Sequence, residues 1–310
     1  MMFNAFRSLL RREDVETPAL FDEAFLRRLE RLALQPDRTL RGGIMGAHRS
    51  RRRVPGPYMV DHRPYASGDD LRYVDWHAYG RSDHLFVKLT EAAQDVNVHV
   101  VIDHSGSMRW GAPPKLFATL RLVAAIGYIA LANGDRVSVT PFAGRVDDPF
   151  GPIQSRQQAA ALRHFLEDIQ PSASPANGSA AAEAVRQVTR TRRGGLLVLA
   201  SDLLADDWVQ ALRPLRPPRW QTLVLHVLDP LELAPTLEDD LDLEDIETGE
   251  RVPVAVTGAT LDTYRNRVER WCADTEAACE RLGATYARVQ TDWPIERVVI
   301  PYLRRRRMLG

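Results

Sequence analysis

The sequence is poor in several features that would assign it to a particular class of protein. Its 310 residues include only two cysteines, Cys272 and Cys279. They stand seven positions apart in a helical pattern, which puts them two turns apart and too far for a disulfide in a straight helix. We expect two reduced thiols and a cytoplasmic protein. Lysine is nearly absent as well, with Lys88 and Lys115 the only two, and this bias by itself indicates no function.

Net charge and long apolar runs are also lacking. Lys and Arg number 41 and Asp and Glu number 41, so no overall field favours a nucleic acid or an anionic membrane as partner. No apolar run approaches the roughly 18 residues of a membrane span, and Arg7, Arg11 and Arg12 interrupt the start. We therefore expect neither a signal peptide nor a transmembrane segment.

Motifs of common enzyme classes are missing too. Ser105 lacks a Gly-x-Ser-x-Gly frame, and the chain has neither a Gly-x-x-x-x-Gly-Lys-Ser/Thr phosphate loop nor a His-Glu-x-x-His zinc motif. We expect no enzymatic activity. A metal-dependent hydrolase that uses His104 or Asp202 as its base is the alternative left open.

The chain divides into three regions. Residues 1–37 form an N-terminal helical region, with apolar residues three or four apart between Phe21 and Leu34 and with Pro36 after them. Residues 38–94, rich in Gly, Pro, aromatics and charge, predict an irregular or β-rich segment packed on the main domain. Residues 95–310 form that domain, with an acidic excursion at 230–256 that we interpret as a hairpin beyond the sheet.

Strands and helices alternate after residue 94, which predicts an α/β fold with a doubly wound, mostly parallel sheet. The helix from Lys115 is apolar nearly all round and should be central and buried. The predicted strands are 58–62 and 85–89 in the irregular segment, then 96–102, 136–142, 196–200, 222–228 and 285–289; the predicted helices are 115–132, 156–169, 179–191, 206–212 and 261–282.

The first strand of the main domain ends in Asp103-x-Ser105-x-Ser107. One carboxylate and two hydroxyls are thereby delivered to a turn at a strand's carboxyl end, where open α/β sheets bind ligands. Hard oxygen ligands of this kind predict a magnesium site.

Two more loops carry oxygen ligands in equivalent positions. Ser179 begins the helix after Gly178, where it is expected to cap that helix and aim its hydroxyl at the first loop. Asp202 follows the strand 196–200 directly. Together the three loops predict a cage made of Asp103, Ser105, Ser107, Ser179 and Asp202.

This pattern resembles the metal-ion-dependent adhesion site (MIDAS) of von Willebrand factor A domains, with Ser179 where that family usually has Thr. The resemblance implies a Rossmann-like fold that binds Mg²⁺, with Mn²⁺ as a possible substitute. It further implies that Ser105 and Ser107 bind the ion directly, that Ser179 binds it directly or through water, and that Asp103 and Asp202 act mainly through water. An open position would accept a carboxylate from a protein partner.

The N-terminal half carries a second pattern, whose signature residues are Arg63, Tyr65, Gly68, Asp69, Asp70, Arg72, Asp75, Trp76 and Arg81. This pattern resembles the signature of the bacterial family called domain of unknown function 58, and the resemblance covers roughly residues 40 to 300. The resemblance implies a partner of MoxR-type AAA+ ATPases, with an adaptor role in a chaperone-like or complex-maturation process; a structural scaffold with an unused metal site is the alternative.

The signature also has a physical logic of its own. Gly68, before two aspartates, suits a turn with a positive φ. We expect Arg72, Asp75 and Arg81 to form a buried, charge-paired lattice around Trp76 that pins the irregular segment onto the sheet domain. A ligand-binding or catalytic role for these residues is the alternative.

Overall fold

The structure is a computed structural model that describes residues 20–25, 27, 53–55, 61–91, 96–172, 178–191, 194–205, 208–236, 241–244 and 251–295. The chain forms two compact units. The smaller one spans residues 45–95, and the larger one combines 1–44 with 96–310. Each unit is described below by itself.

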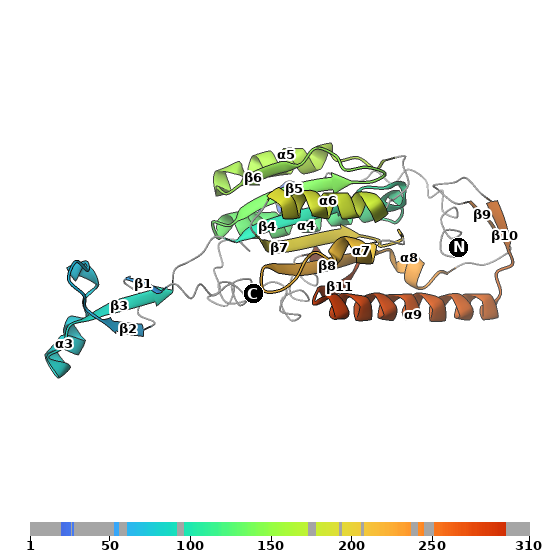
Figure 1. Cartoon of the computed structure of the whole chain (residues 1–310). Coiled ribbons are helices and arrows are strands. Elements are labelled where there is room, and N and C mark those ends of the chain that lie inside the picture. The colour runs from blue at the N-terminus through green and yellow to red at the C-terminus, as the bar shows by residue number, and fades with distance from the viewer. Residues whose placement is uncertain are drawn as a thin grey trace. The chain divides into compact units, whose positions relative to one another are not determined.

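A six-stranded sheet forms the centre of the larger unit (Figure 1). Its strand order is β11-β8-β7-β4-β5-β6, and all neighbours run parallel except β5 and the edge strand β6. The predicted α/β class with a mostly parallel sheet is therefore confirmed. The strands are β4 (Asn97–Asp103), β5 (Arg136–Phe142), β6 (Phe150–Ile153), β7 (Gly195–Ser201), β8 (Trp220–Leu228) and β11 (Thr285–Gln290).

Helices cover both faces of this sheet, because alternate side chains of the buried strands point to opposite faces. On β4, Val98, Val100 and Ile102 join the core beneath α4 (Lys115–Ala132) and α5 (Ala159–Asp168). Val101 joins the opposite core, beneath α6 (Gly178–Thr191), α7 (Trp208–Leu212) and α9 (Gly258–Leu282). The arrangement is visible in Figure 1.

The central helix α4 has the bounds that the sequence predicts. Among the described residues it is the one helix long and apolar enough, by length and composition, to cross a membrane, and 78% of it is buried inside the protein. That burial is typical of the core helix of an α/β sheet. Phe25, from the short N-terminal helical stretch, also lies in this core, with the Arg121 guanidinium 4.2 Å from its ring centre. The rest of the helix predicted over 21–34 lies outside the described residues, apart from Arg27.

Short elements account for the main differences from the sequence prediction. Edge strand β6 and helix α8 (Pro230–Leu233) were not predicted, and the helix predicted over 156–169 begins with a 3-10 turn, η4 (Arg156–Gln158), before α5. Residues 241–244 and 251–254 form β9 (Leu241–Glu244) and β10 (Arg251–Val254), an antiparallel pair that confirms the predicted hairpin.

The smaller unit is a three-stranded antiparallel sheet of order β1-β3-β2 with one short helix. Its elements are β1 (Arg53–Pro55), β2 (Asp61–Pro64), the 3-10 turn η2 (Leu71–Tyr73), α3 (Trp76–Ser82) and β3 (Phe86–Glu91). Residues 58–60 of the strand predicted over 58–62 lie outside the described residues. That this unit packs on the larger one stays a prediction.

Candidate metal centre

The first loop of the site follows β4 at the carboxyl edge of the sheet. Asp103 is the last residue of β4, and its Oδ1 accepts a hydrogen bond from the Ser105 amide at 2.9 Å, which folds the chain into a tight turn. Ser107 lies in the 3-10 turn η3 (Gly106–Arg109). The hydroxyl oxygens of Ser105 and Ser107 lie 2.9 Å apart, and all three side chains are buried.

The second loop, after β7, is tied directly to the first. The Ser201 hydroxyl donates to Asp103 Oδ2 at 2.6 Å and accepts from the Leu203 amide at 2.9 Å. Asp202 is completely buried, and its Oδ1 accepts from the Leu204 amide at 3.3 Å. Strands β4 and β7 are parallel neighbours, so their carboxyl ends bring Asp103 and Asp202 to one place.

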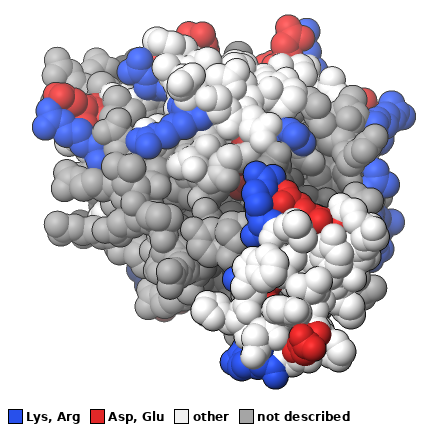
Figure 2. All heavy atoms as spheres, turned by 90° about the vertical axis from the view of Figure 1, so that its left-hand side faces the viewer, with Lys and Arg blue, Asp and Glu red and all other residues white. Residues whose placement is uncertain are grey.

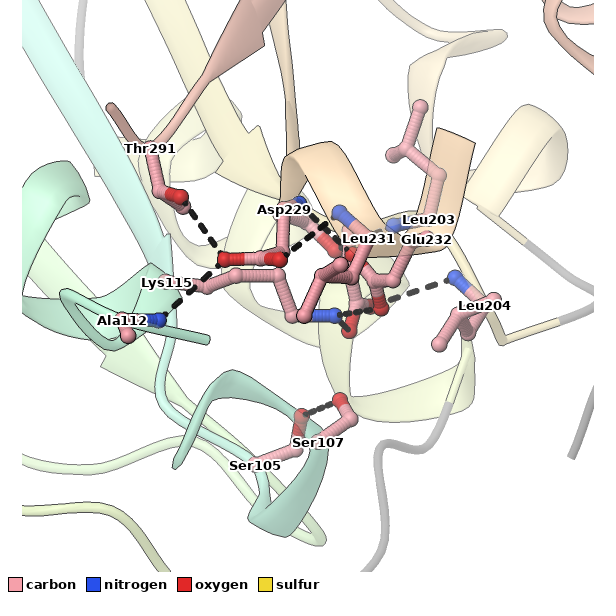
Figure 3. A network of polar contacts seen from close by, with 12 residues as sticks. Ser105, Ser107, Ala112, Lys115, Leu203, Leu204, Asp229, Leu231, Glu232 and Thr291 are labelled. Atoms are coloured by element: carbon pink, nitrogen blue, oxygen red, sulfur yellow. Dashed lines mark hydrogen bonds and ion pairs between the residues drawn. The ribbon is translucent and has the colours of Figure 1, made fainter. Parts of the chain in front are cut away.

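Lys115 adds a cation that the sequence analysis did not assign to the site. It is the first residue of α4 and is fully buried. Its Nζ donates to Asp202 Oδ2 at 2.8 Å and to Glu232 Oε1, on α8, at 2.7 Å. Figure 3 shows the Lys115 ammonium beside Glu232, with the Ser105 and Ser107 hydroxyls below them in this view. The signal available in the sequence was a lysine at the start of a helix that is otherwise buried, since a buried ammonium requires a carboxylate partner.

A further carboxylate, Asp229, holds the neighbouring loops in place (Figure 3). Its Oδ2 accepts from the Thr291 hydroxyl at 3.0 Å and from the Ala112 amide at 3.2 Å, and its Oδ1 caps α8 through the Leu231 amide at 2.9 Å. Gly111 has φ +103°, and a Cβ there would lie 2.6 Å from Asp229 Oδ2, so the loop before α4 can approach this carboxylate only with a glycine.

The charges of the cluster do not balance. Asp103, Asp202 and Glu232 are three largely buried carboxylates, and Lys115 is the ammonium between two of them. Burial, followed by repulsion from Asp202, raises the pKa of Asp103 to about 6. Burial also raises the pKa of Glu232, although Lys115 opposes that shift. The cluster therefore favours an additional positive charge.

The donor set fits Mg²⁺. The Ser105 and Ser107 hydroxyl oxygens lie at hydrogen-bond distance from each other, next to the buried carboxylates Asp103 and Asp202. The single ammonium of Lys115 does not balance the negative charge of this cluster. Mg²⁺ prefers oxygen ligands, with carboxylates among them. Ser105 and Ser107 would hold the ion, with Asp103 and Asp202 behind them.

Ser179 differs from the other four predicted ligands. It is the second residue of helix α6 as described, and its side chain is exposed whereas the other four are buried. Its predicted capping role stays a prediction. Its place in the metal site stays a prediction.

His104, between Asp103 and Ser105, points away from the hydroxyl pair. Its Nδ1 lies 2.9 Å from the Gln170 carbonyl oxygen, and its Nε2 lies 2.9 Å from Asp147 Oδ2. It lines a cavity of about 500 Å³ together with Asp147, Phe165 and Asp168. Nδ1 is thus hydrogen-bonded outside the predicted metal site, and Nε2 lies beside Asp147 without forming a hydrogen bond.

The signature residues do not form the buried lattice that the sequence suggested. Arg72 is 81% exposed and pairs with its neighbour Asp70 at 2.6 Å, Arg81 is exposed, and Trp76 is 58% exposed. The predicted lattice is wrong because the turn geometry lets Arg72 fold back onto Asp70, which also caps η2.

Two other pairs stabilise the signature turn. Asp75 is buried; its Oδ2 lies 2.7 Å from His62 Nε2, and its Oδ1 caps α3 through two amides. The His62 hydrogen bond, with these amides, lowers the pKa of Asp75 to about 2. Arg63 binds Asp69 through both terminal guanidinium nitrogens, Nη1 and Nη2, at 2.7 and 2.5 Å. Tyr65 precedes this turn, and Gly68 has φ +101°, the conformation that the sequence predicted for it.

Charges elsewhere are mixed. On the face shown in Figure 2, the described acidic and basic side chains form small groups of both signs among uncharged atoms. No continuous field of one sign is seen among the side chains described on that face. This agrees with the overall balance of charge.

Comparison with known proteins places the chain in a family. A family model described as "Protein of unknown function DUF58" matches residues 61–278, which include the signature turn and every predicted metal ligand. The chain belongs to this family. Uncharacterized proteins of Mycobacterium tuberculosis and Mycobacterium bovis are each 27% identical to it over 286 residues, which is 91% of this chain and 88% of each relative.

Solved structures similar to the chain include two bacterial proteins. The conserved hypothetical protein BatB from Bacteroides thetaiotaomicron is 18% identical, with a TM-score of 0.44, over 68% of this chain and 98% of that one. A von Willebrand factor type A protein from Catenulispora acidiphila is 17% identical, with a TM-score of 0.35, over 46% of this chain and 35% of that one.

Proposed function

We propose that the protein is a non-enzymatic, Mg²⁺-dependent protein-interaction module. The observation that carries the proposal is the buried cluster of Asp103, Ser105, Ser107 and Asp202 at the carboxyl ends of two adjacent parallel strands. Hydroxyl ligands leave a bound ion electrophilic, so a carboxylate from a partner is a natural additional ligand. The MIDAS-like pattern of these residues supports the same role.

The partner that we propose is a MoxR-type AAA+ ATPase, in a chaperone-like or complex-maturation process. The test is capture of purified ATPase by the full chain in Mg²⁺ and in EDTA, with the Asp103→Ala variant and, as a matched control, Asp274→Ala on the exposed side of α9. We expect capture in Mg²⁺ only, lost in Asp103→Ala and kept in the control. Capture that persists in EDTA and in Asp103→Ala would refute the metal-bridged contact.

A structural scaffold with an unused metal site is the second candidate. It is favoured by one observation, the Lys115 ammonium that already pairs with both Asp202 and Glu232. Calorimetric titration with Mg²⁺ separates the two candidates, because an unused site gives no saturable heat that depends on Asp202.

A metal-dependent hydrolase is the least supported alternative. His104, the nearest histidine in sequence, has its Nδ1 bound to the Gln170 carbonyl oxygen and its Nε2 beside Asp147, away from Ser105. Phosphatase and esterase assays on the pure protein test this alternative, which requires an activity that Ser105→Ala abolishes.

We also propose a cytoplasmic location, which the free, buried Cys272 and Cys279 support and which cell fractionation tests.

A further inference from the structure

Lys115 stands in a position that is unfavourable for a lysine on two counts. It is fully buried, and it is the first residue of an 18-residue helix, whose amino-terminal end repels cations. A buried ammonium is tolerated only when hydrogen-bonded carboxylates compensate its lost hydration. Asp202 and Glu232 provide them at 2.8 and 2.7 Å.

The two carboxylates that share this ammonium differ in their surroundings. Asp202 interacts electrostatically with Asp103, and both belong to the predicted metal site. Glu232 is held on α8 by separate contacts: its Oε2 accepts from the Asp229 amide at 2.8 Å, and its carbonyl oxygen accepts from the Tyr264 hydroxyl at 2.7 Å. Glu232 therefore stays in place as a partner for the ammonium, whatever happens at Asp202.

We propose that Lys115 is a tethered counter-ion of the metal site, which competes with the metal for Asp202 and moves its contact toward Glu232 when a divalent cation binds. This inference rests on the proposed Mg²⁺-dependent function. The ammonium ties the start of α4 to the loop after β7 and to α8 when no metal is bound, and its charge weakens metal binding.

A regulatory consequence follows from the same charges. Since the ammonium repels a divalent cation, the free protein binds the ion weakly. A carboxylate from a partner adds a negative charge at the ion and offsets that repulsion. Metal and partner carboxylate therefore bind cooperatively, and the ion is retained mainly in the complex.

The shortage of lysine makes this inference directly measurable on the unmodified protein. With Lys88 and Lys115 as the only lysines, selective ¹³Cε-lysine labelling gives two NMR signals, which Lys88→Met assigns. Lys88 is on β3 of the smaller unit and serves as the internal control. We expect Mg²⁺ to shift the Lys115 signal and not that of Lys88, and Mn²⁺ to broaden Lys115 selectively.

Substitutions give predictions of opposite sign. Even at the dielectric constant of water, a unit charge about 6 Å from a divalent ion changes its affinity roughly tenfold. Lys115→Met should therefore bind Mg²⁺ at least about tenfold more tightly by calorimetry. Glu232→Gln should bind it more weakly, because the ammonium then loses the Glu232 carboxylate and competes more strongly for Asp202, and Lys88→Met should bind it as the wild type does. Damage to folding would weaken binding in both site variants.

The outcomes separate this inference from the proposed function. Saturable Mg²⁺ binding with an unmoved Lys115 signal, or a folded Lys115→Met variant with unchanged or weaker affinity, overturns the counter-ion role alone. Should Lys115→Met fail to fold, the lysine signals of the wild-type protein decide. Absence of Mg²⁺ binding in both the wild type and folded Lys115→Met overturns the proposed function and this inference with it.

Discussion

Removing the charge of Asp103 should stabilise the metal-free protein while it disables the metal site. In Asp103→Asn, the neutral amide keeps the shape of the carboxylate and avoids both its burial cost and its repulsion from Asp202. Residues that evolved to bind an ion carry this cost when the ion is absent.

The magnitude follows from the raised pKa. The difference between about 6 and the ordinary 3.8 corresponds to about 3 kcal/mol at pH 7. One hydrogen bond, from Ser105 or Ser201, is weakened by the amide, at a cost of about 1 kcal/mol. The net gain is about 2 kcal/mol, or a rise in Tm of about 4 to 8 °C.

The assay is thermal unfolding by circular dichroism in EDTA. At pH 7.5 the variant should melt above the wild type. The group's folded pKa is raised, so its contribution to stability is complete below about pH 4 and is lost as the pH rises through about 6. The difference between the two proteins should therefore nearly vanish at pH 4.

The variant must be compared with the wild type at each pH, because His226 changes the stability of both proteins with pH in the direction opposite to Asp103. Burial lowers the pKa of His226 to about 3, so the wild-type protein loses stability from this group as the pH falls below about 6.5. Asp274→Asn, at an exposed position on α9, is the matched control and should melt as the wild type does. An Asp103→Asn variant that melts below the wild type at pH 7.5 in EDTA would refute the reasoning.

Three further predictions concern the fold. Gly195→Ala should destabilise the larger unit by at least about 2 kcal/mol in urea unfolding, because the φ of Gly195 is +143° and a Cβ there would lie 2.1 Å from the Asn97 carbonyl oxygen. Gly258→Ala, which places its Cβ in open space, is the control and should be nearly neutral. Arg72→Ala should leave the smaller unit folded, since the Arg72 guanidinium is exposed. Asp75→Ala should make that unit more sensitive to limited proteolysis, because it removes the cap of α3 and the partner of His62. Equal sensitivity of the two variants would contradict this. Because the pKa of Asp75 is lowered to about 2, its contribution is present above about pH 4 and is lost as the pH falls toward 2, which pH-dependent proteolysis of wild type and Asp75→Asn can follow.

The larger unit was predictable from the sequence because its elements have regular patterns. The apolar strands around Val100 and Val198 and the largely apolar helix α4 fall where the sequence pattern predicted them. Strand β6 was missed because it is a four-residue edge strand that contains Pro152 and has a mostly exposed pattern. A run of four residues with Gly and Pro at its centre has no periodicity to detect.

The candidate site was predictable only in part. Asp103 and Asp202 each end or follow a buried strand, and the parallel sheet brings such positions together. Lys115 and Glu232 were missed because they are 117 positions apart, on elements whose meeting depends on the tertiary fold. The signature turn was misread for a similar reason, since pairing of Arg72 with Asp70 instead of Asp75 depends on local turn geometry.

The most direct test of the account is calorimetric titration of Mg²⁺ into the wild-type protein and Asp202→Asn, with Asp274→Asn as control. The account predicts saturable binding of one ion in the wild type and the control, and a roughly 10- to 100-fold weaker affinity in Asp202→Asn, because this carboxylate orients the ligands of the ion. No saturable heat in the wild type, or an affinity that Asp202→Asn leaves unchanged, would contradict the metal site on which the proposed function rests.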